Sequence, residues 1–161
     1  MIKCGGGDDG LYEDRKFEQN IQGALANGIQ VGVYFYSGAS NAREAYDEAS
    51  YCISLIRDYQ ITYPVAFDWE LDGDYDSVTE ACETFCNVIS SYGYQPMVYS
   101  NRNRWYNNFD GEKIASKYKV WMAEYFGKFY YDSVRWTYGD DLPNFRYHYD
   151  MWQYSSRCFV D

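Results

Sequence analysis

Residues 64–70 read Pro64-Val65-Ala66-Phe67-Asp68-Trp69-Glu70, a short apolar run that ends in two carboxylates one residue apart. Such a run predicts a buried β-strand. Side chains alternate along a strand, so Asp68 and Glu70 share one face, about 6.6 Å apart along the backbone, and Trp69 points the other way. An isolated pair of this kind can be a solvated strand end, but the spacing also suits two carboxyl groups acting on one glycosidic bond.

Predicted helices and strands alternate on both sides of this run. Apolar residues at helical spacing predict one helix after Asp14, closed by Gly28. A second helix is expected after Asn41, and a third from a capping box at residues 77–80. Further strands are predicted at 30–36, 95–100, 119–125 and 149–154, with a loop before the last. This alternation indicates a parallel sheet, either a barrel or an open sheet, with ligands at the carboxyl ends of its strands.

The composition fits one globular domain over residues 1–161 with an unusual share of aromatic side chains. Aromatic residues make up 21% of the chain, so we expect aromatic-lined surfaces as well as an aromatic core. The formal net charge is −10. Because nucleic acids and anionic membranes are bound mainly by Lys and Arg, we expect neither as a partner, and a neutral polymer fits better. Neither a membrane-spanning run nor a signal-peptide pattern is evident, so the compartment stays open.

The cysteines give no sign of a disulfide framework or a metal site. Their number is odd, and no C-x-x-C pair or histidine cluster suggests zinc. We therefore expect buried free thiols, no metal and no cofactor. The five cysteines are Cys4, Cys52, Cys82, Cys86 and Cys158.

Two other polar patterns have an ordinary interpretation. Five acidic residues follow the ligand spacing of a calcium-binding loop, but Ser77 replaces its glycine and a helix is predicted to start there. An acidic turn before a helix is therefore the better interpretation. His148, the single histidine, is expected on the surface. The five acidic residues are Asp72, Asp74, Asp76, Glu80 and Glu83.

Five motifs carry a family resemblance. They are Gly32-Val33-Tyr34-Phe35-Tyr36-Ser37, Phe67-Asp68-Trp69-Glu70, Val98-Tyr99-Ser100-Asn101, Val120-Trp121-Met122-Ala123-Glu124-Tyr125 and Met151-Trp152-Gln153-Tyr154-Ser155-Ser156. Their order and spacing resemble glycoside hydrolase family 25, the Chalaropsis-type lysozymes of bacteria and phages. With the similar segment from Asp14 to Ile29, the resemblance covers nearly the whole chain.

The resemblance implies a modified TIM-like (β/α) barrel with parallel strands. It implies hydrolysis of the β-1,4 bond between N-acetylmuramic acid and N-acetylglucosamine in bacterial cell-wall peptidoglycan. Glu70 matches the general acid, and Asp68 would orient and charge-stabilise the 2-acetamido group, the internal nucleophile of a substrate-assisted route. Glu70 would then be kept protonated by an ionised Asp68 in a partly desolvated site. Spacing alone leaves retention and inversion open. Candidates to line the groove, or alternatively to pack the barrel, are Tyr34, Tyr36, Tyr99, Trp121 and Tyr125.

The chain departs from the family pattern at both ends. Family members begin with a strand bearing an Asp-Val-Ser motif and a helix, and they end with a strand carrying another acidic residue; neither end is matched here. We therefore expect a truncated barrel that lacks its first and last strands, with edges through which it could pair with another chain. Two functions stay open: an N-acetylmuramidase acting through Glu70 and Asp68, and a non-catalytic glycan-binding or structural relic of the fold.

Overall fold

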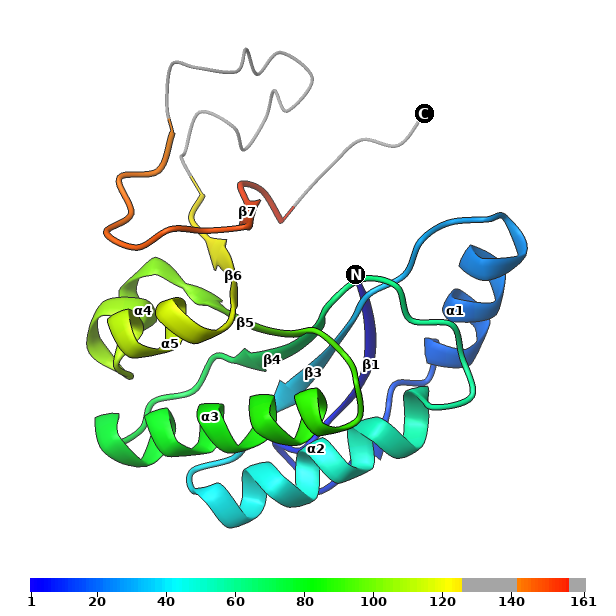
Figure 1. Ribbon diagram of the computed structural model, residues 1–161, viewed down its shortest axis with the longest axis horizontal. Helices are drawn as coiled ribbons and strands as arrows, with labels where there is room; N and C mark the ends of the chain where they lie inside the picture. Colours follow the sequence, from blue (N-terminus) through cyan, green and yellow to red (C-terminus); the bar gives the residue numbers. More distant parts are fainter. Residues whose placement is uncertain (126–141, 157–161) are drawn as a thin grey trace.

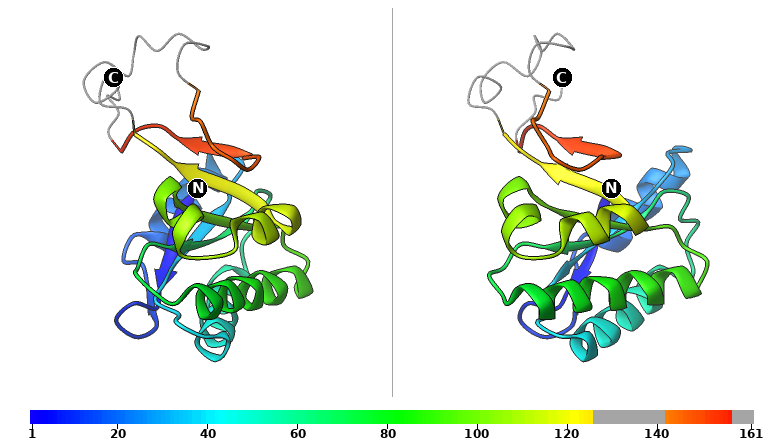
Figure 2. Two further views of the ribbon diagram at one scale, coloured as in Figure 1. Left: turned by 90° about the vertical axis from the view of Figure 1, so that its left-hand side faces the viewer. Right: turned by 60° about the vertical axis from the view of Figure 1, so that its left-hand side comes forward.

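The computed structural model describes residues 1–125 and 142–156. Their centre is a sheet of seven strands in the order β2-β1-β3-β4-β5-β6-β7, in which only the β1–β2 pair is antiparallel. The predicted parallel sheet is therefore confirmed, and β6 and β7 lie side by side at one end of it (Figure 2). The strands are β1 (Ile2–Gly6), β2 (Tyr12–Glu13), β3 (Val33–Ser37), β4 (Val65–Trp69), β5 (Pro96–Asn101), β6 (Lys119–Ala123) and β7 (Met151–Gln153).

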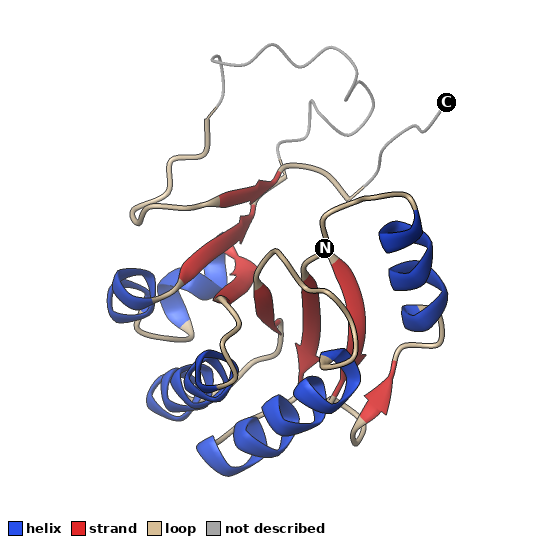
Figure 3. Ribbon diagram, turned by 45° about the vertical axis from the view of Figure 1, so that its right-hand side comes forward, coloured by secondary structure: helices blue, strands red, loops and turns tan. Residues whose placement is uncertain are grey.

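Helices cover the outer face of the sheet, and α2 and α3 pack side by side along it (Figures 1 and 3). All three predicted helices are present, and their apolar stripes face the strands. None of the described helices is both long and apolar enough to cross a bilayer. The helices are α1 (Phe17–Ala26), α2 (Ala42–Ile56), α3 (Tyr75–Ser91), α4 (Arg102–Asn107) and α5 (Gly111–Lys117).

The main core lies between the outer face of the sheet and these helices. Phe35 on β3 and Phe67 on β4 contact Phe85 on α3, with ring centroids 6.1 and 5.1 Å apart respectively. Every residue of β4 is buried, as expected for a central strand of a parallel sheet. The alternation along β4 then fixes the opposite face, because residues between the core positions must point away from the helices.

Strand β1 was not predicted, because a run of glycines weakens a strand signal. In the structure the glycines allow close approach of other elements. A Cβ atom on Gly5 would lie 2.3 Å from the carbonyl oxygen of Tyr12, and one on Gly7 would lie 2.1 Å from Oε1 of Glu48. Only glycine therefore lets β2 and α2 pack this closely against the end of β1.

The helix ends confirm two of the predicted signals and correct the third. Gly28 has a φ of +70° directly after α1, and Asn41 caps α2 by accepting a hydrogen bond from the main-chain N–H of Glu44. The capping box predicted at residues 77–80 is wrong. Asp74 is the N-cap of α3, and its carboxylate accepts hydrogen bonds from the N–H and hydroxyl of Ser77 at 3.1 and 2.9 Å.

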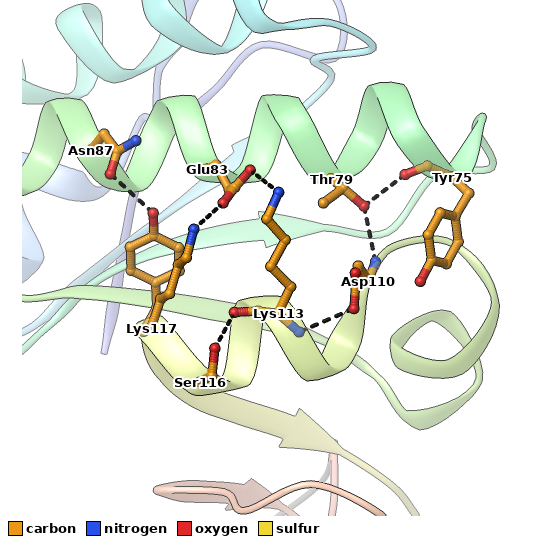
Figure 4. A network of polar contacts seen from close by, with 9 residues as sticks. Tyr75, Thr79, Glu83, Asn87, Asp110, Lys113, Ser116 and Lys117 are labelled. Atoms are coloured by element: carbon orange, nitrogen blue, oxygen red, sulfur yellow. Dashed lines mark hydrogen bonds and ion pairs between the residues drawn. The ribbon is translucent and has the colours of Figure 1, made fainter.

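Helices α4 and α5 were not predicted, because each is too short for its apolar period to show. Helix α5 is tied to α3 by a polar network (Figure 4). Glu83 accepts hydrogen bonds from Lys113 and Lys117 at 2.8 and 2.6 Å, and the main-chain N–H of Asp110 donates to Thr79. Glu83 and Asp74, two of the five residues at calcium-loop spacing, are thus already engaged. Within the described ranges no three acidic, cysteine or histidine side chains gather to hold a metal.

Candidate functional site

One row of paired residues crosses five strands on the face opposite the helices. Tyr36 on β3 pairs with Asp68 on β4, Asp68 pairs with Tyr99 on β5, and the row continues through Trp121 on β6 to Met151 on β7. In a parallel sheet, residues in register point to the same side. The carboxylate at the end of β4 is therefore flanked by aromatic side chains from both neighbouring strands.

This row borders a cavity of about 550 Å³. Met1, at the start of the chain, and Met151 and Gln153, on the last described strand, line it together with residues from the middle of the sheet. The sheet is therefore curved enough for the residue before β1 and the edge strand β7 to face one space, as in a barrel. Six of the seven predicted site residues line this cavity: Tyr34, Asp68, Glu70, Tyr99, Trp121 and Tyr125.

Tyr36, the seventh predicted site residue, does not line the cavity, although it points to the same side of the sheet. Sequence reasoning missed Met1, Met151 and Gln153. The registers of β1 and β7 decide what these residues face, and they depend on pairing between distant segments. A signal was available for Gln153, since it lies in the Trp-Gln-Tyr motif.

Asp68 is the more buried member of the carboxylate pair. It is 4% exposed, whereas Glu70 is half-buried just beyond the end of the strand. Burial, followed by the charge of Glu70, raises the pKa of Asp68 to about 8, against a weaker opposing effect of Lys3. The expectation of an ionised Asp68 therefore needs correction for the unliganded site, because the deeper carboxyl favours its protonated form.

The hydrogen bonding of the Asp68 carboxyl group is also informative. Its Oδ1 atom is buried, and no N–H or hydroxyl donor of the described residues reaches it. Buried carboxylate oxygens are normally hydrogen-bonded, because leaving one without a donor costs free energy. An unmatched acceptor in a cavity wall therefore fits a ligand that brings its own donor.

The backbone of the pair is held through Trp69, which points to the outer face as predicted. Its indole Nε1 donates to the carbonyl oxygen of Ala39 at 3.2 Å. The hydroxyl of Ser100 on β5 donates to the carbonyl oxygen of Trp69 at 2.7 Å. That carbonyl belongs to the peptide bond that leads into Glu70. Two hydrogen bonds from neighbouring segments thus fix the chain between the two carboxylates.

The wall of the cavity on the β5 and β6 side is aromatic. The ring of Trp121 lies 4.5 Å from that of Tyr99 and 6.1 Å from that of Tyr34, measured between centroids. Burial and the charge of Glu70 raise the pKa of Tyr99. The side-chain amide of Gln153 donates to the hydroxyl of Tyr125. These contacts give neutral, ordered rings of the kind on which sugars stack.

Lys3 adds a positive charge to this side of the sheet, which the sequence reasoning did not predict. It is in register with Tyr34, and its ammonium lies 4.9 Å from the ring centroid of Tyr36 and 5.5 Å from that of Tyr12. It is also the cation that acts on Asp68, Tyr34 and Tyr36. Among the described residues, Lys3 is thus the cation that acts on Asp68.

A second buried carboxyl, Glu48 on α2, lies outside the cavity. It accepts hydrogen bonds from the hydroxyl of Ser37 at 2.5 Å and from the N–H of Gly38 at 2.9 Å. Burial raises its pKa to about 7, although these hydrogen bonds oppose the rise. Glu48 thus orders the turn after β3, whose Ala39 carbonyl receives the Trp69 indole.

The remaining predictions concern residues away from the cavity. Four cysteines are buried free thiols, as predicted, and Cys158 lies outside the described residues. His148 is exposed and lies 3.6 Å from a carboxylate oxygen of Asp150. Trp152 packs against the core and donates its indole N–H to the carbonyl oxygen of Glu124. The four described cysteines are Cys4, Cys52, Cys82 and Cys86.

Comparison with solved structures identifies the fold. The CTP1L endolysin superposes with a TM-score of 0.76 at 23% identity, covering 98% of this chain and 51% of that one. The Cpl-1 endolysin in complex with a peptidoglycan analogue gives a TM-score of 0.67 at 25% identity, covering 97% of this chain and 44% of that one. The curved, mostly parallel sheet is thus consistent with the irregular β/α barrel of these proteins.

Sequence comparison agrees. The lysozyme of Streptococcus phage Cp-1 is 30% identical over 139 residues, which are 80% of this chain and 37% of that protein. The D-alanyl-L-alanine endopeptidase of Streptococcus phage B30 is 33% identical over 101 residues, 59% of this chain and 22% of that protein. This chain therefore spans well under half the length of these relatives. The model of the family "Glycosyl hydrolases family 25" matches residues 1–161. The chain belongs to family 25 of the glycosyl hydrolases.

Proposed function

We propose that this chain hydrolyses the β-1,4 bond between N-acetylmuramic acid and N-acetylglucosamine in bacterial peptidoglycan. The observation that carries the proposal is the buried Oδ1 of Asp68, which lacks a donor within the described residues and lies beside Glu70 in an aromatic-walled cavity. An acetamido N–H on the sugar would supply that donor. The Cp-1 relative is named a lysozyme, and the Cpl-1 endolysin binds a peptidoglycan analogue, which supports the same substrate class.

Glu70 is the general acid in this proposal, and Asp68 acts on the acetamido group. With a pKa of about 8, Asp68 itself holds a proton at neutral pH before the sugar binds. When the acetamido N–H donates to Asp68, the ionised form of Asp68 is favoured, because hydrogen bonds to a carboxylate lower its pKa. The proton then resides on Glu70, which is nearer to the cavity mouth. Substrate binding would thus establish the protonation state that the chemistry needs.

The reaction then proceeds in two balanced steps. Glu70 gives its proton to the glycosidic oxygen as the bond from that oxygen to C1 breaks, and the acetamido carbonyl oxygen of the same sugar bonds to C1. Asp68 stabilises the positive charge on the resulting five-membered ring. Water next gives a proton to Glu70 and attacks C1, while the bond from C1 to the acetamido oxygen breaks. Glu70 is then again the acid, and the configuration at C1 is retained.

Clearing of a Gram-positive cell-wall suspension tests this proposal. We expect the unmodified chain and the control Glu112→Gln, at an exposed position on α5, to clear the suspension at equal rates. Glu70→Gln should lower the rate on the order of 100-fold or more, since it keeps the shape and loses the acid. Equal and negligible clearing by the unmodified chain and Glu70→Gln would refute the enzyme and favour a glycan-binding protein.

The products separate this activity from that named for the phage B30 relative. A muramidase releases new reducing ends on muramic acid, whereas an endopeptidase releases new amino groups. Mass spectrometry of borohydride-reduced products distinguishes the two. We expect reduced muramic acid ends and no increase in free amines.

A further inference from the structure

Lys3 places an ammonium group on the same side of the sheet as the carboxylate pair. Its register partner on β3 is Tyr34, which lines the cavity. Cys4, the next residue, points to the opposite face, where its sulfur lies 3.8 Å from that of Cys52 on α2. The alternation along β1 therefore directs Lys3 away from the helices.

The ammonium is held between two aromatic rings. Its Nζ atom lies 4.9 Å from the ring centroid of Tyr36 on β3 and 5.5 Å from that of Tyr12 on β2. A cation over the face of a ring is attracted by the ring quadrupole, so both rings restrain the lysine head. Within the described residues no hydrogen-bond acceptor is seen for this ammonium group. An ammonium has three donors, and contacts with ring faces leave them available.

Within residues 1–125 and 142–156, Lys3 differs from the lysines of α5 and β6 in having no ion-pair partner. Lys113 and Lys117 both pair with Glu83, and Lys119 pairs with Asp150 at 2.6 Å. Among the described residues none forms an ion pair with Lys3; Asp14 and Asp68 act on it only through space. The chain has a net charge of −10, so a cation without an ion-pair partner in the described residues is unusual. The Lys3 ammonium beside the cavity is therefore available to bind an anionic group of a ligand.

The substrate of the proposed function has one anionic region near the bond that is cleaved. The sugar rings are neutral, but muramic acid carries a lactyl ether on C3, next to the acetamido group on C2. That branch ends in a carboxyl group or, when a peptide is attached, continues into residues with their own carboxyl groups. If Asp68 binds the acetamido group, the branch leaves from the adjacent carbon. Lys3 lies two strands from Asp68, roughly 10 Å between backbones, and its long side chain shortens that gap.

We infer that Lys3 is a specificity-determining residue that binds a carboxylate on the lactyl-peptide branch of muramic acid. The inference rests on the proposed function, since it concerns the same site. It implies that the site prefers muramic acid chains with an ionised branch over otherwise identical neutral chains. A charge-assisted hydrogen bond of this kind corresponds to about tenfold in affinity.

Calorimetric titration of a protein carrying Glu70→Gln, which prevents turnover, tests the inference. The first two ligands are tetrasaccharides of the peptidoglycan repeat, one with a free lactyl carboxylate and one with that group as a methylamide. The second two carry a dipeptide whose second residue is glutamate or its neutral amide. We expect about tenfold tighter binding of the charged member in one pair, and that pair identifies the source of the carboxylate.

Three further substitutions assign the preference to Lys3. Lys3→Met should abolish it, and Lys3→Arg should keep most of it. Lys16→Met changes the net charge equally at an exposed position and should leave the preference intact.

Equal affinity for charged and neutral ligands in the Glu70→Gln protein overturns the inference, even if Lys3→Met fails to fold. The inference is also overturned if the preference for the charged ligand survives Lys3→Met, or if Lys3→Met weakens the binding of all four ligands equally. Equal hydrolysis of charged and neutral chains by the unmodified protein would refute this inference and leave the muramidase proposal standing.

Discussion

At the scale of single residues, burial decides how the two carboxylates share a proton. Asp68 lies inside the end of β4 and Glu70 lies just outside it, so only Asp68 is almost fully removed from water. The sequence predicted that the two would share a face and interact. The family resemblance implied a proton on Glu70 and an ionised Asp68, whereas burial favours the protonated form of Asp68. The depth of each side chain could not be predicted, because it depends on how strongly the sheet curves over the cavity.

Asp68→Asn should therefore stabilise the protein in alkaline solution. Between about pH 4 and pH 8 the folded protein keeps a proton on Asp68 that the unfolded chain releases, so stability falls as pH rises through this range. A rise of the Asp68 pKa from 3.8 to about 8 corresponds to about 6 kcal/mol. We expect the free energy of unfolding of Asp68→Asn to exceed that of the unmodified protein by about this amount at pH 9, with the difference shrinking towards pH 4.

Urea unfolding at pH 4, 6 and 9 measures this difference. Glu48 also has a raised pKa, but it is present in both proteins, so its effect cancels in the comparison. A difference between the two proteins that does not change with pH would contradict the prediction.

At the scale of elements, the hydrogen bond from Ser100 on β5 to the Trp69 carbonyl on β4 couples two strands at the site. Ser100 is fully buried, so the bond is shielded from water. The sequence predicted both strands and the outward direction of Trp69. It did not predict this bond, because the pairing of Ser100 with that carbonyl follows from the register between two strands that are separated by α3.

Ser100→Ala should impair catalysis as well as stability. Loss of the bond leaves the Trp69 carbonyl without this donor, which costs about 1 to 3 kcal/mol. The peptide leading into Glu70 would also be less well fixed, so we expect kcat to fall about tenfold with KM little changed. Steady-state kinetics on solubilised peptidoglycan measures both constants.

Ser116→Ala is the matched control. It removes a hydroxyl that donates to the Lys113 carbonyl on the exposed side of α5, and it should leave both constants unchanged. If Ser100→Ala lowers the melting temperature but not kcat, the bond serves stability alone.

The helices show which signals in a sequence suffice by themselves. Asn41 and Gly28 mark helix ends through local chemistry, and both were predicted correctly. Residues 77–80 form an equally good local pattern, but Asp74 begins the helix earlier. The choice between two adequate caps depends on where the chain leaves β4, which is a tertiary property. The same holds for β1, whose glycines make sense only beside Tyr12 and Glu48.

At the scale of the whole molecule, the sheet and three helices enclose one main core, and four thiols are distributed through it. Cys4 lies on β1, Cys52 on α2, and Cys82 and Cys86 on α3, and none is exposed. A hydrogen bond to Cys4 and burial raise the pKa of Cys52, and burial raises that of Cys82. Low thiolate content and lack of access both suppress reaction with disulfide reagents.

These thiols should therefore report global unfolding. In a Cys158→Ser protein we expect almost no reaction with Ellman's reagent in native buffer and release of four equivalents in concentrated urea. The reaction rate at intermediate urea should follow the unfolding transition measured by circular dichroism. Rapid reaction of one or more thiols in native buffer would show that β1 or a helix opens locally.

The parallel sheet, the helices on one face and most of the cavity wall follow from short-range patterns and the family motifs. The meeting of Met1 and Met151 in one cavity does not, because it depends on the accumulated twist and curvature of every strand between them. Lys3 was missed for the same reason, as its relation to the site appears only once β1 is paired with β3.

The position of Trp121 also has an optical consequence. Its indole lines the cavity in contact with Tyr99, whereas the indoles of Trp69 and Trp105 are enclosed in the core. A saccharide that settles on the cavity wall would change the polarity around the indole of Trp121 and leave those of Trp69 and Trp105 unaffected. The molecule therefore carries a built-in fluorescent reporter of occupancy at the very surface where the carbohydrate is expected to lie.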